Sequence, residues 1–125
     1  MGAKRILIVD DEPNIVMSLE YAFKKKSYDV YIARDGTEAL EIAKEQSPGI
    51  ILLDVMMAKM DGYNTLIKIK EVAYLNNTKV IFLSAKDKKN DIEKGINLGA
   101  DEYITKPFSI KKLIEKVELI ITETN

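Results

Sequence analysis

Short apolar runs alternate with longer amphipathic segments along the whole chain. The runs are rich in aliphatic and β-branched residues, and we predict strands at residues 5–9, 28–33, 50–55, 79–84 and within 99–105. The run at 50–55 is apolar almost throughout, which is typical of a central strand that is covered on both faces. Apolar residues in the intervening segments recur every three or four positions, which predicts a helix after each strand.

The predicted helices have recognisable ends. We place them at residues 13–26, 37–45 and 63–73, in the segment that begins with the polar residues 87–90, and at residues 109–122. Asp10-Asp11 ahead of Pro13 predicts the first helix start, with an aspartate as its N-cap. Turn signals at Ser47-Pro48-Gly49 and Asn76-Asn77 separate two of the helices from the next strand.

Strands that alternate with helices predict an α/β fold. Right-handed crossovers place helices on both faces of a doubly wound parallel sheet. The length of 125 residues fits a single domain over residues 1–125, of which we expect about 4–122 to be structured.

Composition narrows the function classes. With 19 basic and 20 acidic residues the net charge is −1, so no overall field draws the chain onto nucleic acid or an anionic membrane. The chain has no cysteine and no histidine, which excludes disulfides, zinc sites of cysteine or histidine, and catalysis by imidazole or thiolate. Its apolar runs are too short to span a bilayer, and we expect a cytoplasmic protein.

Five polar residues stand at or just after the ends of predicted strands. They are Asp10, Asp11, Asp54, Ser84 and Lys106. The carboxyl ends of parallel strands share one edge of the sheet, where ligands bind. One ammonium leaves two of the three carboxylates uncompensated, which indicates a divalent cation. The acidic pair taken alone fits a plain helix cap, but a carboxylate ending an apolar central strand is costly unless it is paired or ligated.

Four motifs resemble one known family. They are the pair Asp10-Asp11, the segment DVMMAKMDG at 54–62, Ser84-Ala85, and GADEYITKPF at 99–108. Because these motifs occur in this order and at this spacing over the full length, the chain resembles the receiver domain of bacterial response regulators. That domain accepts a phosphoryl group in two-component signalling. The resemblance implies a (βα)5 flavodoxin-like sheet with strand order 2-1-3-4-5. Ala58 stands where the family usually has proline, and Ser84 where threonine is more common.

The resemblance also implies roles for individual residues. Asp54 would be the phosphoacceptor, and Lys106 would contact the phosphoryl group. Asp11, Asp54 and the backbone carbonyl of Met56 would bind Mg²⁺, which Asp10 would help to position. The nucleophile would be a carboxylate that is already ionised at neutral pH, so no general base is needed.

Further implied roles concern regulation. Ser84 and Tyr103 would form a switch pair, in which the serine moves toward the phosphoryl oxygen and the tyrosine ring moves inward. Lys106-Pro107 is a candidate cis peptide. Met56 and Lys86 would flank the path of the attacking water and tune the phosphoryl lifetime.

The favoured function is a phosphorylation-dependent signalling switch. Its expected partner is a sensor histidine kinase or a phosphotransfer domain. The face formed by the fourth helix, fifth strand and fifth helix would control output, and the chain would form a homodimer on phosphorylation. We expect no direct nucleic-acid or membrane binding. The chain would not be an ordinary enzyme, although it would promote its own phosphorylation and dephosphorylation.

Two other classes use similar folds. A small Mg²⁺-dependent phosphatase with an aspartyl nucleophile needs a second aspartate two residues later, but Met56 follows Asp54 at that spacing and Glu12 follows Asp10. A flavodoxin-like electron carrier needs a phosphate-binding loop after the first strand, where the acidic DDEPN would repel a flavin phosphate.

Overall fold

Five parallel strands form one sheet in the order β2-β1-β3-β4-β5. Their bounds in the computed structural model, which describes residues 4–122, are β1 Arg5–Val9, β2 Asp29–Ala33, β3 Ile50–Leu53, β4 Lys79–Ser84 and β5 Glu102–Thr105. The predicted fold class and strand order are confirmed. The predicted domain ends, residues 1 and 125, lie outside the described residues.

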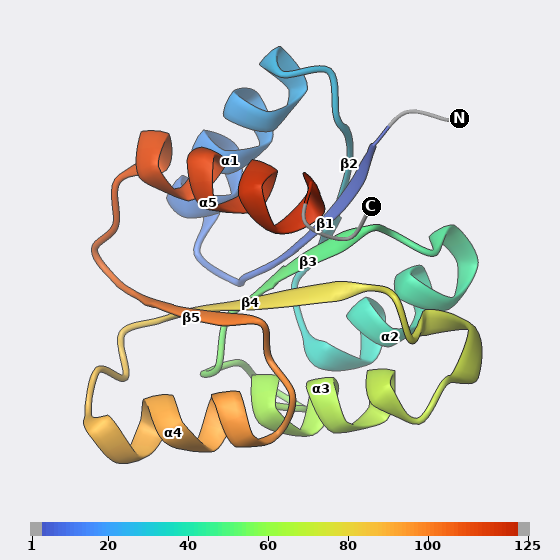
Figure 1. Cartoon of the computed structure of the whole chain (residues 1–125), viewed down its shortest axis with the longest axis vertical. Coiled ribbons are helices and arrows are strands. Elements are labelled where there is room, and N and C mark those ends of the chain that lie inside the picture. Colours follow the sequence, from blue (N-terminus) through green and yellow to red (C-terminus); the bar gives the residue numbers. More distant parts are fainter. Residues whose placement is uncertain (1–3, 123–125) are drawn as a thin grey trace.

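Helices cover both faces of this sheet (Figure 1). Their bounds are α1 Pro13–Lys25, α2 Gly36–Gln46, α3 Gly62–Lys70, α4 Lys89–Asn97 and α5 Ile110–Thr122, with a short 3₁₀ helix η1 at Ala73–Leu75. Helices α1 and α5 lie on one face, and α2, α3 and α4 lie on the other. Among residues 4–122, no helix is long and apolar enough to cross a membrane.

The alternating directions of strand side chains divide the core into two halves. In β1, Leu7 and Val9 belong to the cluster on the α2 and α3 side, whereas Ile6 and Ile8 belong to the cluster on the α1 and α5 side. Successive residues of a strand point to opposite faces, so a central strand covered by helices on both faces must be apolar at every position. This requirement explains the continuous apolar runs of β1 and β3.

Two predicted helix ends are wrong. The third helix stops at Lys70 rather than residue 73, because Val72 has an extended backbone (φ −92°, ψ 111°) and the chain then turns into η1. The N-cap of α1 is Glu12 rather than an aspartate, and no side chain caps it. The reason is that the Glu12 carboxylate accepts a hydrogen bond from Lys106 Nζ at 2.7 Å, while Asp10 Oδ1 accepts one from the Glu12 amide.

Candidate functional site

The register of the sheet brings distant acidic residues to one edge. Val9 of β1 lies beside Leu53 of β3, so Asp10 and Asp54 leave neighbouring strands at the same level. The Asp54 amide donates to the carbonyl of Val9 at 2.9 Å, which extends the pairing by one residue. Asp10 and Asp54 are only 2% and 5% exposed, so both carboxylates are held in a largely dehydrated position.

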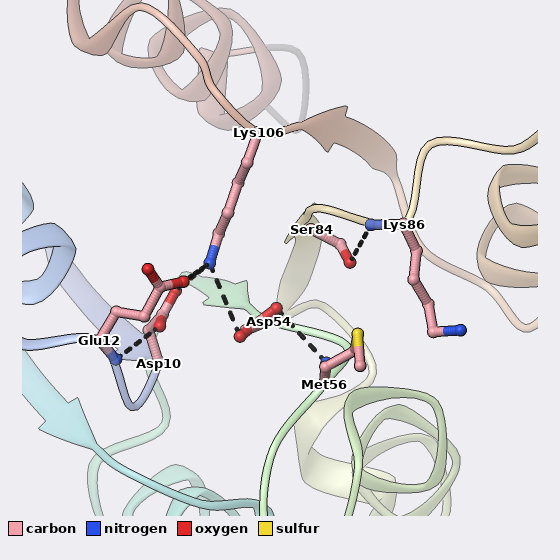
Figure 2. Close-up of polar contacts among 7 residues, drawn as sticks. All are labelled: Asp10, Glu12, Asp54, Met56, Ser84, Lys86 and Lys106. Atoms are coloured by element: carbon pink, nitrogen blue, oxygen red, sulfur yellow. Dashed lines mark hydrogen bonds and ion pairs between the residues drawn. The ribbon is translucent and has the colours of Figure 1, made fainter.

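Lys106 reaches this edge from the end of β5 and faces three carboxylates (Figure 2). Its Nζ lies 2.7 Å from Glu12 Oε1, 2.9 Å from Asp10 Oδ2 and 3.6 Å from Asp54 Oδ2. The ammonium is therefore bonded to Asp10 and Glu12 and only adjacent to Asp54. One positive charge cannot balance three negative ones, so the cluster keeps an excess of negative charge.

The electrostatics of Asp54 reflect this imbalance. Burial is the main factor that raises the pKa of Asp54, to about 6, and the charge of Asp10 raises it further. The Lys106 ammonium and the Met56 amide, which donates to Asp54 Oδ1 at 3.4 Å, oppose the increase. Above pH 6 the group is mostly ionised, and it then needs a compensating cation.

The surroundings of Lys106 favour its charged form, whereas those of Asp54 disfavour the charged form. Burial would lower the pKa of its ammonium, but hydrogen bonds to Glu12 and Asp10 outweigh burial, so the pKa is raised. Lys106 consequently stays charged throughout the physiological range and supplies a permanent positive group beside Asp54.

The acidic group has the chemistry of a magnesium site. One oxygen from each of Asp10, Glu12 and Asp54 lies within 4.8 Å of the others. Carboxylate oxygens are hard ligands of the kind that Mg²⁺ prefers, and the excess negative charge would attract it. Asp11 is exposed and lies outside this group of three, although its charge also raises the pKa of Asp54. The ligand roles given to Asp11 and to the Met56 carbonyl stay predictions.

The proposed switch pair meets at the loop between β4 and α4. The fully buried Ser84 accepts a hydrogen bond from the Lys86 amide at 3.1 Å, which leaves its hydroxyl hydrogen to donate elsewhere (Figure 2). Tyr103 donates its hydroxyl to the Lys86 carbonyl at 2.7 Å. The Tyr103 ring is buried in this structure, so the arrangement seen is the inward one.

The remaining predicted site residues lie around this centre. Met56 is 59% exposed beside Asp54, where its side chain borders the open side of the carboxylate. The Lys86 side chain extends past Met56 rather than toward Asp54 in Figure 2. The peptide bond between Lys106 and Pro107 is cis.

Glu12 is the site residue that the sequence did not identify. Its carboxylate makes the shortest contact of Lys106. Its position directly before Pro13 could have indicated a role in the site, since a residue at the end of a strand-to-helix loop lies at the carboxyl edge of the sheet.

Known proteins match this chain over nearly its full length. A family model described as the response regulator receiver domain matches residues 6–118. A receiver domain of a Francisella response regulator is 34% identical, with 98% of this chain and 99% of that chain covered and a TM-score of 0.90. A CheY-like receiver domain protein from Methanospirillum hungatei is 30% identical, with 98% and 96% covered and a TM-score of 0.91.

A third similar structure is part of a kinase. It is the signal receiver domain of a signal transduction histidine kinase from Syntrophus aciditrophicus, which is 30% identical, with 97% of this chain and 92% of that chain covered and a TM-score of 0.88. Because the family model and these structures each span most of the sequence, the chain belongs to the family of response regulator receiver domains, the signal-receiving part of two-component systems.

Proposed function

We propose that this chain is a phosphorylation-dependent switch that accepts a phosphoryl group on Asp54, from a histidine kinase, a phosphotransfer domain or a small phosphodonor. The observation that carries the proposal is the position of Asp54, a buried carboxylate 3.6 Å from the partly buried ammonium of Lys106 at the carboxyl edge of the sheet. Membership of the receiver domain family supports the same function.

The chemistry that we infer requires no general base. An ionised oxygen of Asp54 attacks phosphorus, and the bond between phosphorus and the donor's leaving atom breaks, with the electron pair departing on the donor. Lys106 lies where it can compensate charge on the transferred oxygens. Asp10, Asp54 and Asp11 or Glu12 would hold Mg²⁺, which when bound would neutralise the phosphoryl oxygens and bring them close to the carboxylate.

Ser84 and Tyr103 connect the site to the surface in this proposal. The free hydroxyl hydrogen of Ser84 can bond to a phosphoryl oxygen, and both residues contact Lys86 in the loop that leads into α4. A change at Asp54 would therefore alter the face formed by α4, β5 and α5.

Homodimerisation through this face is part of the proposal. The face carries charges of both signs, at Lys88, Lys89, Asp91, Asp101, Glu102, Lys111, Lys112 and Glu115. A mixed-charge surface can pair with a second copy of itself about a two-fold axis. Sedimentation with and without beryllofluoride tests this; a monomer under both conditions would contradict it.

Intact mass measures the central step of this function. After incubation with acetyl phosphate and Mg²⁺, we expect one added phosphoryl group on the parent chain and none on Asp54→Asn. Chelation of Mg²⁺ by EDTA should prevent the addition, because the excess negative charge would repel the donor.

The matched control is Asp29→Asn, which removes an exposed carboxylate at the start of β2 and should be phosphorylated like the parent. Equal phosphorylation of Asp54→Asn and the parent would contradict the role of Asp54. Equal yields with EDTA and with Mg²⁺ would contradict the metal requirement.

A further inference from the structure

Tyr63, in the first turn of α3, lies at one end of a row of three aromatic rings. Its ring packs edge-on against Phe82 of β4 with centroids 5.5 Å apart, and Phe82 in turn lies 5.7 Å from the ring of Tyr103. The row therefore crosses from α3 through β4 to β5 beneath α4. Tyr63 and Tyr103 are both buried, which makes their hydroxyl contacts matter for the packing of this region.

The two tyrosine hydroxyls hold adjacent parts of the same segment. Tyr103 donates to the Lys86 carbonyl in the loop before α4, and Tyr63 donates to the Asp91 carbonyl in the first turn of α4 at 3.0 Å. Each hydroxyl carries one hydrogen, and each donates it to a backbone carbonyl of the segment that leads into and begins α4. Tyr63 thus bonds to the helix that follows the switch loop, and its ring is linked to the ring of the switch tyrosine through Phe82.

Helix α4 has few apolar anchors of its own. Gly95 is its only buried residue, whereas α3 buries five residues. A Cβ atom at Gly95 would lie 2.9 Å from the Tyr103 ring and 3.0 Å from the Phe82 ring, so α4 rests directly on the aromatic row. Ile92 of α4 packs against the core but is only partly buried, so the position of α4 also depends on contacts such as those made by Tyr63.

A second contact joins Tyr63 to α4. The ammonium of Lys94 lies 4.5 Å from the centroid of the Tyr63 ring, close enough for a cation–π interaction. On its other side, Tyr63 is tied to the phosphoacceptor segment, because the adjacent Gly62 donates its amide to the Val55 carbonyl at 2.8 Å and packs against the backbone carbonyl of Asp54. Tyr63 therefore bridges the Asp54 segment and α4.

We propose that Tyr63 is a positioning residue of the switch: its hydroxyl fixes the first turn of α4, and α4 in turn covers the Tyr103 ring and keeps it buried. The proposal rests on the switch function above but adds a second tyrosine to the pair Ser84 and Tyr103. It explains why the Tyr103 ring is buried in this structure and how a shift of the segment that follows Asp54 reaches α4 by a route that bypasses Ser84.

Tyr63→Phe tests this role because it removes only the hydroxyl and keeps the ring against Phe82 and under Lys94. The matched control is Tyr74→Phe, since the Tyr74 hydroxyl also donates to a backbone carbonyl at 3.0 Å, that of Lys44, far from α4. Two measurements on protein without any phosphodonor are informative. They are amide hydrogen exchange across the chain and the ¹⁹F spectrum of fluorotyrosine-labelled protein, in which Tyr103→Phe assigns the Tyr103 signal.

In Tyr63→Phe we expect exchange of the α4 amides to accelerate roughly fivefold, as the loss of one buried hydrogen bond implies, while exchange in β1 and β3 stays unchanged. The Tyr103 signal should move toward the position of a solvent-exposed ring. Tyr74→Phe should change neither. A general loss of stability would instead accelerate exchange in every element.

A double-mutant cycle separates action through Tyr103 from independent support of α4. If the two hydroxyls act together, Tyr63→Phe should change α4 exchange less in the Tyr103→Phe background than in the parent. Unchanged α4 exchange and an unchanged Tyr103 signal in Tyr63→Phe, or strictly additive effects in the cycle, would overturn the proposal. These readouts do not depend on phosphorylation, so failure of Asp54 to accept a phosphoryl group would leave their outcome intact.

Discussion

Replacing Asp54 with asparagine should stabilise the metal-free protein at neutral and higher pH. The pKa of Asp54 rises from 3.8 to about 6 in the fold, chiefly because the carboxylate is buried and because Asp10 repels its charge. The folded chain therefore binds this proton more tightly than the unfolded chain does. An amide at this position mimics the neutral carboxyl in size and has no charge to be dehydrated.

The size and the pH range of the effect follow from the same shift. A difference of about two pKa units corresponds to about 3 kcal/mol of folding free energy. Below about pH 3 the carboxyl is protonated in both states and the parent has no penalty. The penalty grows as the pH rises from the unfolded pKa of 3.8 to the folded pKa of about 6, and it is fully present at pH 8. Lys106 keeps Asp10 and Glu12 as partners in the variant, so its own charge stays paired.

Urea unfolding in EDTA at several pH values measures this difference. At pH 8 we expect Asp54→Asn to be more stable than the parent by about 3 kcal/mol, or about 10 °C in the thermal midpoint for a chain of this length. At pH 4 the difference should shrink to about 0.5 kcal/mol, because the folded carboxyl is then protonated and the unfolded one is only partly ionised. The control Asp29→Asn, at an exposed position, should stay within about 0.5 kcal/mol of the parent throughout. A pH-independent difference, or a less stable Asp54→Asn at pH 8, would refute the reasoning.

Three further substitutions have defined outcomes. Met56→Asn places a polar group beside the open side of Asp54, where it can orient the attacking water. We expect phosphoryl loss to be roughly tenfold faster, equivalent to a barrier lower by about 1.4 kcal/mol. A decay rate after donor removal as slow as the parent's would contradict this. Glu12→Gln removes the negative charge that competes with other partners of Lys106. Because Glu12 is half exposed, we expect the dissociation constant for beryllofluoride in the presence of Mg²⁺, measured by NMR titration, to fall only roughly threefold. Weaker binding would show that Glu12 supports the metal instead. Gly36→Ala would place a Cβ atom 2.6 Å from the Met60 carbonyl oxygen, and we expect it to lower the free energy of unfolding in urea by about 1–3 kcal/mol. The control Gly49→Ala, whose Cβ atom would have its nearest neighbour at 3.8 Å, should be tolerated. Equal stabilities of the two variants would refute the close packing of α2 on the loop after β3.

Local signals in the sequence were sufficient for the fold class, whereas the strand order followed from the family resemblance. A buried parallel strand must be apolar on both faces, and this requirement marks β1, β3 and β4 directly in the sequence. A carboxylate at the end of such a strand, as at Asp54, is out of place in a core and therefore indicates a site. The helix ends were less predictable, since α3 stops where Val72 turns to an extended conformation that helical spacing does not reveal.

Contacts between distant residues explain why the sequence did not predict the roles of Glu12 and Tyr63. Glu12 bonds to Lys106, 94 positions away, and this bond replaces the expected cap at the start of α1. Tyr63 directly follows the segment at 54–62, but its partners Asp91 and Lys94 belong to another helix. Such pairings depend on side-chain positions at the meeting point of several elements, which periodicity along one element does not encode.

Locating the phosphoryl group at a single residue tests the account most directly. Borohydride reduces an aspartyl phosphate to homoserine, so peptide mapping after incubation with acetyl phosphate and Mg²⁺ identifies the acceptor. We predict homoserine at position 54, and none in samples that contain EDTA or lack the phosphodonor. Homoserine at position 10 or 11, or no homoserine in a protein that has gained a phosphoryl group, would contradict the assignment of Asp54 as the acceptor.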